Sequence, residues 1–198
     1  MPDSGSYLID RHRLFYTPSV NAYALTRKKV LTPEKQFFGM ALGSEKFGGL
    51  SGLPGTTTEV SRISTLFSDP TVVYGSSSSE SFLKSNIQPY EYVHVATHGV
   101  LDSRQPMFSY LLLAPSDNED GMLTVNEIFG LDMNASLVVL SACETGLGIL
   151  NRGDELIGLS RSFLYAGSKD VIVSLWSVAD EATAYLMTQF YVNLMEHP

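Results

Sequence analysis

A histidine and the only cysteine of the chain each follow a short apolar run. His98 and Gly99 come directly after YVHVAT, and Cys143 comes directly after LVVLSA. If these runs are neighbouring strands of a parallel sheet, His98 and Cys143 lie at the same sheet edge, about 5 Å apart at the backbone. A thiol attacks as its thiolate, and an adjacent imidazole lowers the thiol pKa and can protonate a leaving amine. The pattern therefore predicts nucleophilic catalysis.

The residues beside this pair predict an oxyanion site and no metal site. The backbone amides of Gly99 and Cys143 are candidate donors to a developing oxyanion, and Gly99 lets a substrate backbone approach closely. His94 and His98 are four residues apart on a predicted strand, where they do not form the zinc-binding face of a helix, so we expect no metal and treat His94 as a core histidine. Spacing leaves a second interpretation open for Cys143, since free cysteines are among the most buried residues.

Apolar runs alternate with helical patterns along most of the chain. The runs are QFFGMAL, TVVY, YVHVAT, LVVLSA and DVIVSLW. Such alternation predicts an α/β sandwich with a mostly parallel sheet. The segment before the first run, YLIDRHRLFYTPSV, is interpreted as a pair of strands closed by Pro18.

Polar residues predict where the helices begin and end. Three pairs have the spacing of a capping box, and they are Thr56 with Glu59, Ser77 with Glu80, and Thr124 with Glu127. Asp154 and Asp180 are expected to begin two later helices, the first of which would end at Gly167 in a left-handed conformation.

Composition restricts the class of protein. The 198 residues, 44% of them apolar, suit one domain. A single cysteine excludes an internal disulfide and favours a reducing compartment, so we expect a cytoplasmic protein. The net charge of -8 argues against direct nucleic-acid binding, and no apolar run reaches the length of a membrane span.

Several longer motifs resemble one family closely. They are VHVATHG, DGMLTVNEIFGL, LVVLSACETGLG, GLSRSFLYAGSKDVIVSLWSVADEAT and MTQFYVNL. Together they resemble the CHAT domain, a caspase-like module related to separase and often found behind tetratricopeptide repeats in bacterial proteins. The resemblance implies a caspase-like three-layer α/β/α sandwich and a cysteine endopeptidase of peptide or protein substrates, with His98 and Cys143 as its dyad, without a cofactor, and gated by an attached repeat or sensor domain.

The resemblance also implies a substrate pocket. In separases, an acidic residue of the LW-x-V-x-D element recognises a basic side chain before the cut, and the matching residue here is Asp180. Asp180 is equally well placed to cap a helix. Trp176 is a candidate peptide contact, and Asp154 with Glu155 is a weaker candidate for the acidic role.

The chain departs from the family pattern at both ends, and two alternatives accompany this interpretation. CHAT domains are longer than this chain, so residues 1–198 are expected to be one domain truncated at both ends. One alternative is a catalytically silent CHAT module that serves as a signalling scaffold. The other is a small-molecule-binding doubly wound domain, which ranks last because the glycines after the first strand lack the dinucleotide-binding spacing.

Overall fold

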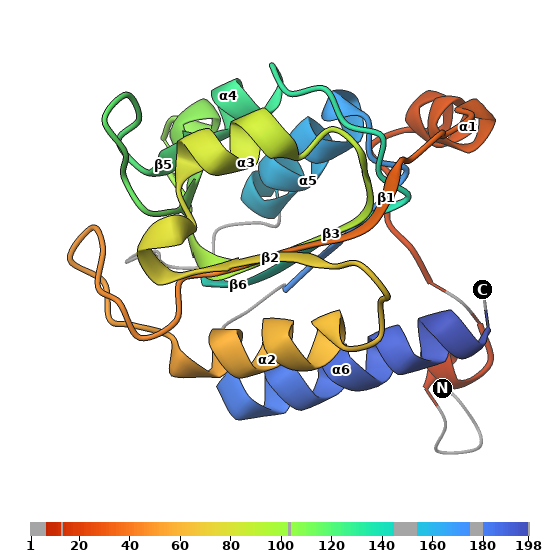
Figure 1. Cartoon of the computed structure of the whole chain (residues 1–198). Coiled ribbons are helices and arrows are strands. Elements are labelled where there is room, and N and C mark those ends of the chain that lie inside the picture. The colour runs from red at the N-terminus through yellow and green to blue at the C-terminus, as the bar shows by residue number, and fades with distance from the viewer. Residues whose placement is uncertain (1–6, 13, 103, 145–153, 175–179, 198) are drawn as a thin grey trace.

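A sheet lies between two layers of helices in this computed structural model (Figure 1). The structure describes residues 7–12, 14–102, 104–144, 154–174 and 180–197. The strands are β1 (Lys35–Ala41), β2 (Thr71–Tyr74), β3 (Tyr90–Val100), β4 (Tyr110–Leu112), β5 (Met122–Thr124), β6 (Leu137–Glu144) and β7 (Asp170–Val173). The α-helices are α1 (Val20–Lys28), α2 (Pro54–Ser64), α3 (Glu80–Asn86), α4 (Val125–Ile128), α5 (Asp154–Ala166) and α6 (Asp180–Glu196).

The five parallel strands run in the order β2-β1-β3-β6-β7, with β3 at the centre. Beyond the end of β1, the last residues of β3 pair with β4 in antiparallel fashion, and β4 pairs with β5. The sheet is therefore mixed with a parallel core. This confirms the predicted α/β sandwich and is compatible with the caspase-like architecture.

The two faces of the sheet bury different sets of side chains. On the face below α3, α4 and α5, Val93 and Val95 of β3 pack among the apolar side chains of those helices. On the opposite face, α2 and α6 lie side by side (Figure 1) and cover Phe37 of β1 and Val139 of β6. Because side chains alternate along a strand, His94, Ala96 and His98 face the α2 and α6 layer.

The strand pair predicted for the N-terminal segment is wrong. The segment contains a 3₁₀ turn (η1, Leu8–Asp10), and the helix α1 begins at its last residue, after Ser19, which accepts a hydrogen bond from the Ala22 amide at 3.0 Å. Large apolar side chains stay exposed there, including Tyr16 and Val20, and no strand of the described sheet pairs with it. Local capping therefore determines the conformation of this segment.

Lys29, just after α1, attaches this N-terminal segment to the body of the domain. Its ammonium donates hydrogen bonds to the carbonyls of Met133 at 2.9 Å and Gly167 at 2.8 Å. Gly167 follows α5 with a φ of 124°, as the predicted left-handed end of that helix requires. A Cβ at Gly167 would lie 2.2 Å from the Met133 carbonyl oxygen, so this approach needs glycine.

Of the three predicted capping boxes, only the third is confirmed. Thr124 accepts from the Glu127 amide, and Glu127 accepts from the Thr124 amide at 2.9 Å. The first box is wrong, since α2 begins earlier at Pro54 and buries both members of the pair inside the helix. The second is also wrong, since Ser79 caps α3 and accepts from the Phe82 amide at 3.2 Å.

The helices predicted after the cysteine begin where expected. Asp154 and Asp180 are the first residues of α5 and α6. Among the described residues, no helix is both long and apolar enough to cross a membrane.

Candidate active site

His98 and Cys143 are partners across two neighbouring strands. In the parallel pairing of β3 with β6, the Cα partner of His98 is Cys143, and the partner of Gly99 is Glu144. Both strands extend further than predicted, so His98 and Cys143 lie within the last residues of their strands. The cysteine side chain lies outside the described part of the structure, and its role stays a prediction.

The His98 side chain is held by a backbone carbonyl. Its ring is 5% exposed, and its Nε2 lies 2.7 Å from the carbonyl oxygen of Ser51. A carbonyl only accepts hydrogen bonds, so Nε2 must hold a proton and donate it. In the neutral ring, Nδ1 is then the acceptor. Nδ1 is buried without a hydrogen-bond partner among the described residues.

This tautomer is the one that a base at Nδ1 requires. The lone pair on Nδ1 can take a proton, and the Ser51 carbonyl then stabilises the charged ring through the Nε2 proton. Sequence reasoning missed Ser51 because any residue type supplies a backbone carbonyl. The only available signal was the glycine-rich character of the loop from Gly43 to Gly55.

The loop before α2 is fixed by several contacts. The Gly43 amide donates to Thr56 Oγ1 at 3.1 Å, and the same hydroxyl donates to the Leu53 carbonyl at 2.6 Å. Beside Ser51, a Cβ on Gly52 would lie 2.3 Å from the carbonyl oxygen of Ser44. Glycine at this position therefore allows the close backbone approach that places the Ser51 carbonyl.

The predicted oxyanion donor Gly99 lies inside the sheet. Its Cα partners are Glu144 of β6 and Leu111 of β4, so it sits where parallel and antiparallel pairing meet. A Cβ at Gly99 would make only an ordinary contact of 3.6 Å with the Ala142 side chain. The oxyanion role of the Gly99 and Cys143 amides stays a prediction.

The side chains predicted to form a pocket for a basic residue lie outside the described part of the structure. Trp176 lies outside the described residues, as do the side chains of Asp154, Glu155 and Asp180. On the α5 face of the sheet, opposite to the face that carries His98, the described residues line a cavity of about 20 Å³, which holds little more than one water molecule. Its lining is Gly99, Leu101, Leu111, Leu140, Ala142, Leu159, Val173 and Ser174. This cavity is too small for a substrate side chain.

His94 is a core histidine, as expected. It is fully buried, and its Nε2 lies 2.9 Å from Glu59 Oε1 while its Nδ1 lies 3.4 Å from the Tyr191 hydroxyl. Both ring nitrogens therefore have partners within the protein.

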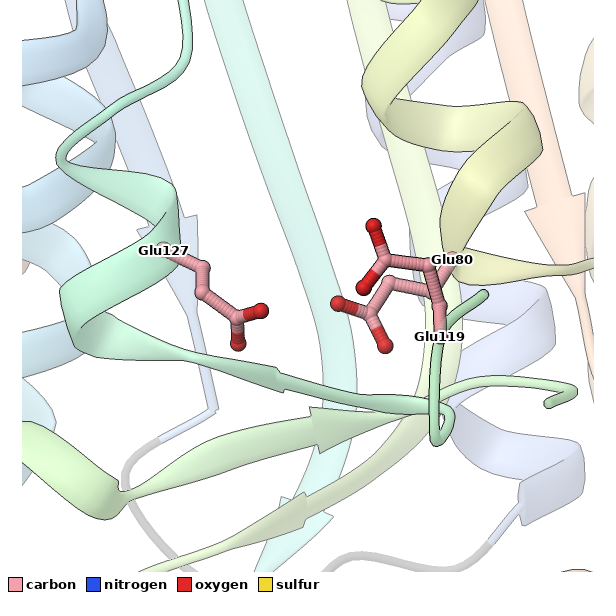
Figure 2. A group of neighbouring side chains, drawn as sticks. All are labelled: Glu80, Glu119 and Glu127. Atoms are coloured by element: carbon pink, nitrogen blue, oxygen red, sulfur yellow. The ribbon is translucent and has the colours of Figure 1, made fainter. Parts of the chain in front are cut away.

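A group of three carboxylates is the one arrangement in the described residues with metal-ligand spacing. Glu80 and Glu119 face Glu127 across a short gap (Figure 2). The Lys84 ammonium lies among them, 2.7 Å from Glu80, 3.0 Å from Glu119 and 2.9 Å from Glu127. A lysine thus supplies the cation at the position a metal would take.

The pKa shifts in this group reflect the shared cation. Burial alone lowers the pKa of Lys84, but the hydrogen bonds that its ammonium donates to the three carboxylates outweigh burial and raise that pKa above its ordinary value. Burial raises the pKa of Glu127, but hydrogen bonds from Thr124 and Lys84 lower it to about 2. Burial is also the largest cause of the raised pKa of Glu80. The group is a structural ion-pair network.

Comparison with known proteins finds two mammalian proteins whose sequences are similar to part or most of this chain. The chain is 35% identical over 74 residues to tetratricopeptide repeat protein 28 of Mus musculus, which is 37% of this chain and 3% of that protein. It is 24% identical over 238 aligned positions to the Homo sapiens protein of the same name, which is 97% of this chain and 10% of that protein. The chain thus spans a small part of these curated relatives. Both relatives are mammalian, whereas the resemblance to the CHAT domain implies a bacterial protein, and that origin stays a prediction.

Comparison with solved structures gives a weaker likeness. A flavodoxin of Streptococcus pneumonia TIGR4 matches with a TM-score of 0.45 and 13% identity, over 82% of this chain and 99% of that one. The family comparison is more specific, because the model of the CHAT domain matches residues 1–198. With the fold and the paired His98 and Cys143 strands in place, this match shows that the chain belongs to the CHAT domain family.

Proposed function

We propose that this CHAT domain is a cysteine endopeptidase with Cys143 as nucleophile and His98 as general acid and base. The family is caspase-like and related to peptidases, which supports the reaction class. The observation with most weight is the Ser51 carbonyl, which leaves His98 Nδ1 as a proton acceptor on the strand next to Cys143.

The proposed reaction has two halves. In the first, the thiol proton passes to His98 Nδ1, and the sulfur attacks the peptide carbonyl carbon and forms a C–S bond. The C–N bond then breaks as the imidazolium returns its proton to the leaving amine, and an acyl-enzyme remains. In the second half, His98 takes a proton from water, the hydroxide attacks the thioester, and the thiol leaves with that proton.

Backbone amides and an acidic residue would complete the site. The amides of Gly99 and Cys143 would stabilise the oxyanion, and Asp180 would select Arg or Lys before the cut through a charge-assisted hydrogen bond. A repeat or sensor domain attached to this chain would gate access. The names of the relatives support such a domain, because both are tetratricopeptide repeat proteins.

The alternative function is a silent CHAT module that acts as a signalling scaffold, and the names of the relatives, both tetratricopeptide repeat proteins, are compatible with that role as well. The two candidates differ in whether Cys143 is chemically activated.

Reactivity of the only cysteine distinguishes them. Because Cys143 is the single thiol, the rate of alkylation by iodoacetamide reports on that residue alone. If His98 activates the thiol, His98→Ala should slow alkylation at neutral pH, while His197→Ala, at an exposed position, should leave it unchanged. Equal rates in wild type and His98→Ala would favour the scaffold.

Cleavage profiling tests the reaction itself. Proteome-wide cleavage by the full-length parent protein should vanish in Cys143→Ala and fall about 100-fold or more in His98→Ala. Asp180→Asn should weaken the preference for Arg and Lys, whereas the exposed control Asp117→Asn should not. An unchanged preference in Asp180→Asn would remove the pocket role from that residue.

A further inference from the structure

A buried polar group lies between β3 and the α2 and α6 layer. It consists of Glu59 of α2, His94 of β3 and Tyr191 of α6, and all three side chains are at most 1% exposed. Glu59 Oε1 lies 2.9 Å from His94 Nε2, and the Tyr191 hydroxyl lies 3.4 Å from His94 Nδ1. Tyr191 also packs edge-on against Phe37 in the apolar cluster on this face.

Burying this polar group in the core costs free energy of folding. Moving a carboxylate and an imidazole out of water is unfavourable, and well-packed apolar side chains of similar volume are often at least as stabilising. The second carboxylate oxygen of Glu59 has no hydrogen-bond partner among the described residues. Burial, with a contribution from the Glu59 charge, raises the pKa of Tyr191 well above its ordinary value. Stability alone does not explain the group.

The strand β3 is joined to α2 and its leading loop at two points. His94 bonds to Glu59 in the second turn of α2, and His98 bonds to Ser51, three residues before that helix begins. The two histidines are on the same strand face, about 13 Å apart. The hydrogen bond between His94 and Glu59 lies within α2 and gives this helix a directional attachment to β3.

We propose that Glu59 and His94 are positioning residues for His98. They fix α2 along β3, and α2 in turn holds the preceding loop so that the Ser51 carbonyl meets His98 Nε2. Without this pair, α2 could shift, the carbonyl would leave the imidazole, and Nδ1 would no longer be the defined acceptor. This inference rests on the proposed function. The tautomer of the His98 ring, however, can be measured without any assay of that function.

The decisive variant is the double substitution Glu59→Met with His94→Phe. It replaces the polar pair by apolar side chains of similar size, so the fold should be kept, although the buried Tyr191 hydroxyl loses its His94 partner. Glu59→Gln is the conservative variant, because it keeps an acceptor for His94. Ile63→Ala is the matched control, since Ile63 is a fully buried apolar residue of the same helix and its loss weakens packing but leaves the pair intact.

Two readouts follow the state of His98. Nitrogen-15 NMR of the imidazole reports which ring nitrogen holds the proton. We expect the Nε2–H form in the wild type, in Glu59→Gln and in Ile63→Ala, and a mixture of tautomers in the double variant. The alkylation rate of Cys143 should fall about fivefold in the double variant, the change equivalent to one buried hydrogen bond.

The outcomes separate the two proposals. A double variant with the wild-type tautomer and alkylation rate overturns the positioning role, and so does an Ile63→Ala variant that loses both to the same extent. If the double variant fails to fold, Glu59→Met is compared with Ile63→Ala by the same readouts. If wild type and His98→Ala alkylate equally fast, the proposed function fails, and the tautomer measurement alone decides this inference.

Discussion

Replacing Lys84 by Met should destabilise the domain through the three carboxylates that surround its ammonium. The substitution keeps the apolar stem of the side chain and removes only the cation, which lies 2.7–3.0 Å from the carboxylates of Glu80, Glu119 and Glu127. Glu80 is fully buried and would keep one hydrogen bond, from the Gly121 amide. Three negative charges would then share one site without compensation.

The magnitude follows from the burial of the group. Removing one partner of a buried ion pair costs about 3–5 kcal/mol, and the lower value applies because the Lys84 side chain is 23% exposed. A loss of about 3 kcal/mol corresponds to a fall in melting temperature of about 6–12 °C for a domain of this size. The exposed control Lys46→Met should change stability by no more than about 0.5 kcal/mol.

The pH dependence gives the prediction its specificity. In the wild type, the lowered pKa of Glu127 contributes stability that is complete above pH 4.5 and is lost as the pH falls toward 2. The raised pKa of Lys84 contributes stability that is complete below pH 10.5 and is lost as the pH rises through its folded value. In Lys84→Met, the uncompensated carboxylates bind protons more readily in the folded state than in the unfolded chain, so the variant gains stability as the pH falls and they become protonated.

The assay is urea unfolding followed by circular dichroism at pH 7 and pH 4. The difference in free energy of unfolding between wild type and variant should fall to about half or less at pH 4, because the wild type loses stability and the variant gains it as the pH falls. Adding Glu80→Gln to Lys84→Met should restore part of the loss, since it removes the buried charge. A variant as stable as wild type at pH 7, or one with the same deficit at both pH values, would refute the ion-pair reasoning.

Three further substitutions test single contacts. Gly52→Ala should slow Cys143 alkylation, because the new Cβ would clash with the Ser44 carbonyl and shift the Ser51 carbonyl that contacts His98. An unchanged rate would argue against a role of the Ser51 carbonyl. Thr124→Ala removes a cap and should cost about 1 kcal/mol in thermal unfolding, so a loss within error would mean that the cap contributes nothing. Gly167→Ala combines a φ of 124° with a clash and should cost about 2 kcal/mol or more, whereas wild-type stability would show that the turn relaxes.

The sheet could be predicted from the sequence because its central strands are buried on both faces. Continuous apolar runs such as LVVLSA are typical of that environment, and the parallel order follows from the helices between them. The same reasoning failed at the N-terminal segment, where Leu14, Phe15 and Tyr16 are exposed and contribute to no strand. Apolar residues alone do not indicate a strand when no neighbouring strand covers them.

Helix starts were predictable only where the cap was local. Thr124 and Glu127 satisfy each other within one turn, so their spacing was enough. Glu59 has the same spacing from Thr56, yet its carboxylate bonds to His94 on another element. Tertiary burial overrode the local pattern there, and a single sequence does not contain that information.

The site could be predicted as far as the register of two strands. That pairing places His98 opposite Cys143 and depends on side chains whose pattern is visible in the sequence. The partner of His98 is a backbone carbonyl 47 residues away, which no residue type indicates. A loop conformation determines its position.

The central place of β3 has a consequence for local opening. This strand has neighbours on both sides along nearly its whole length, whereas β2 and β7 are four-residue strands at the two ends of the parallel order. Amide hydrogens of β3 should therefore exchange with solvent only on global unfolding, while those of the outer strands exchange through smaller fluctuations. His98 thus sits on the part of the sheet that opens last, so its backbone keeps its position while the outer strands fluctuate.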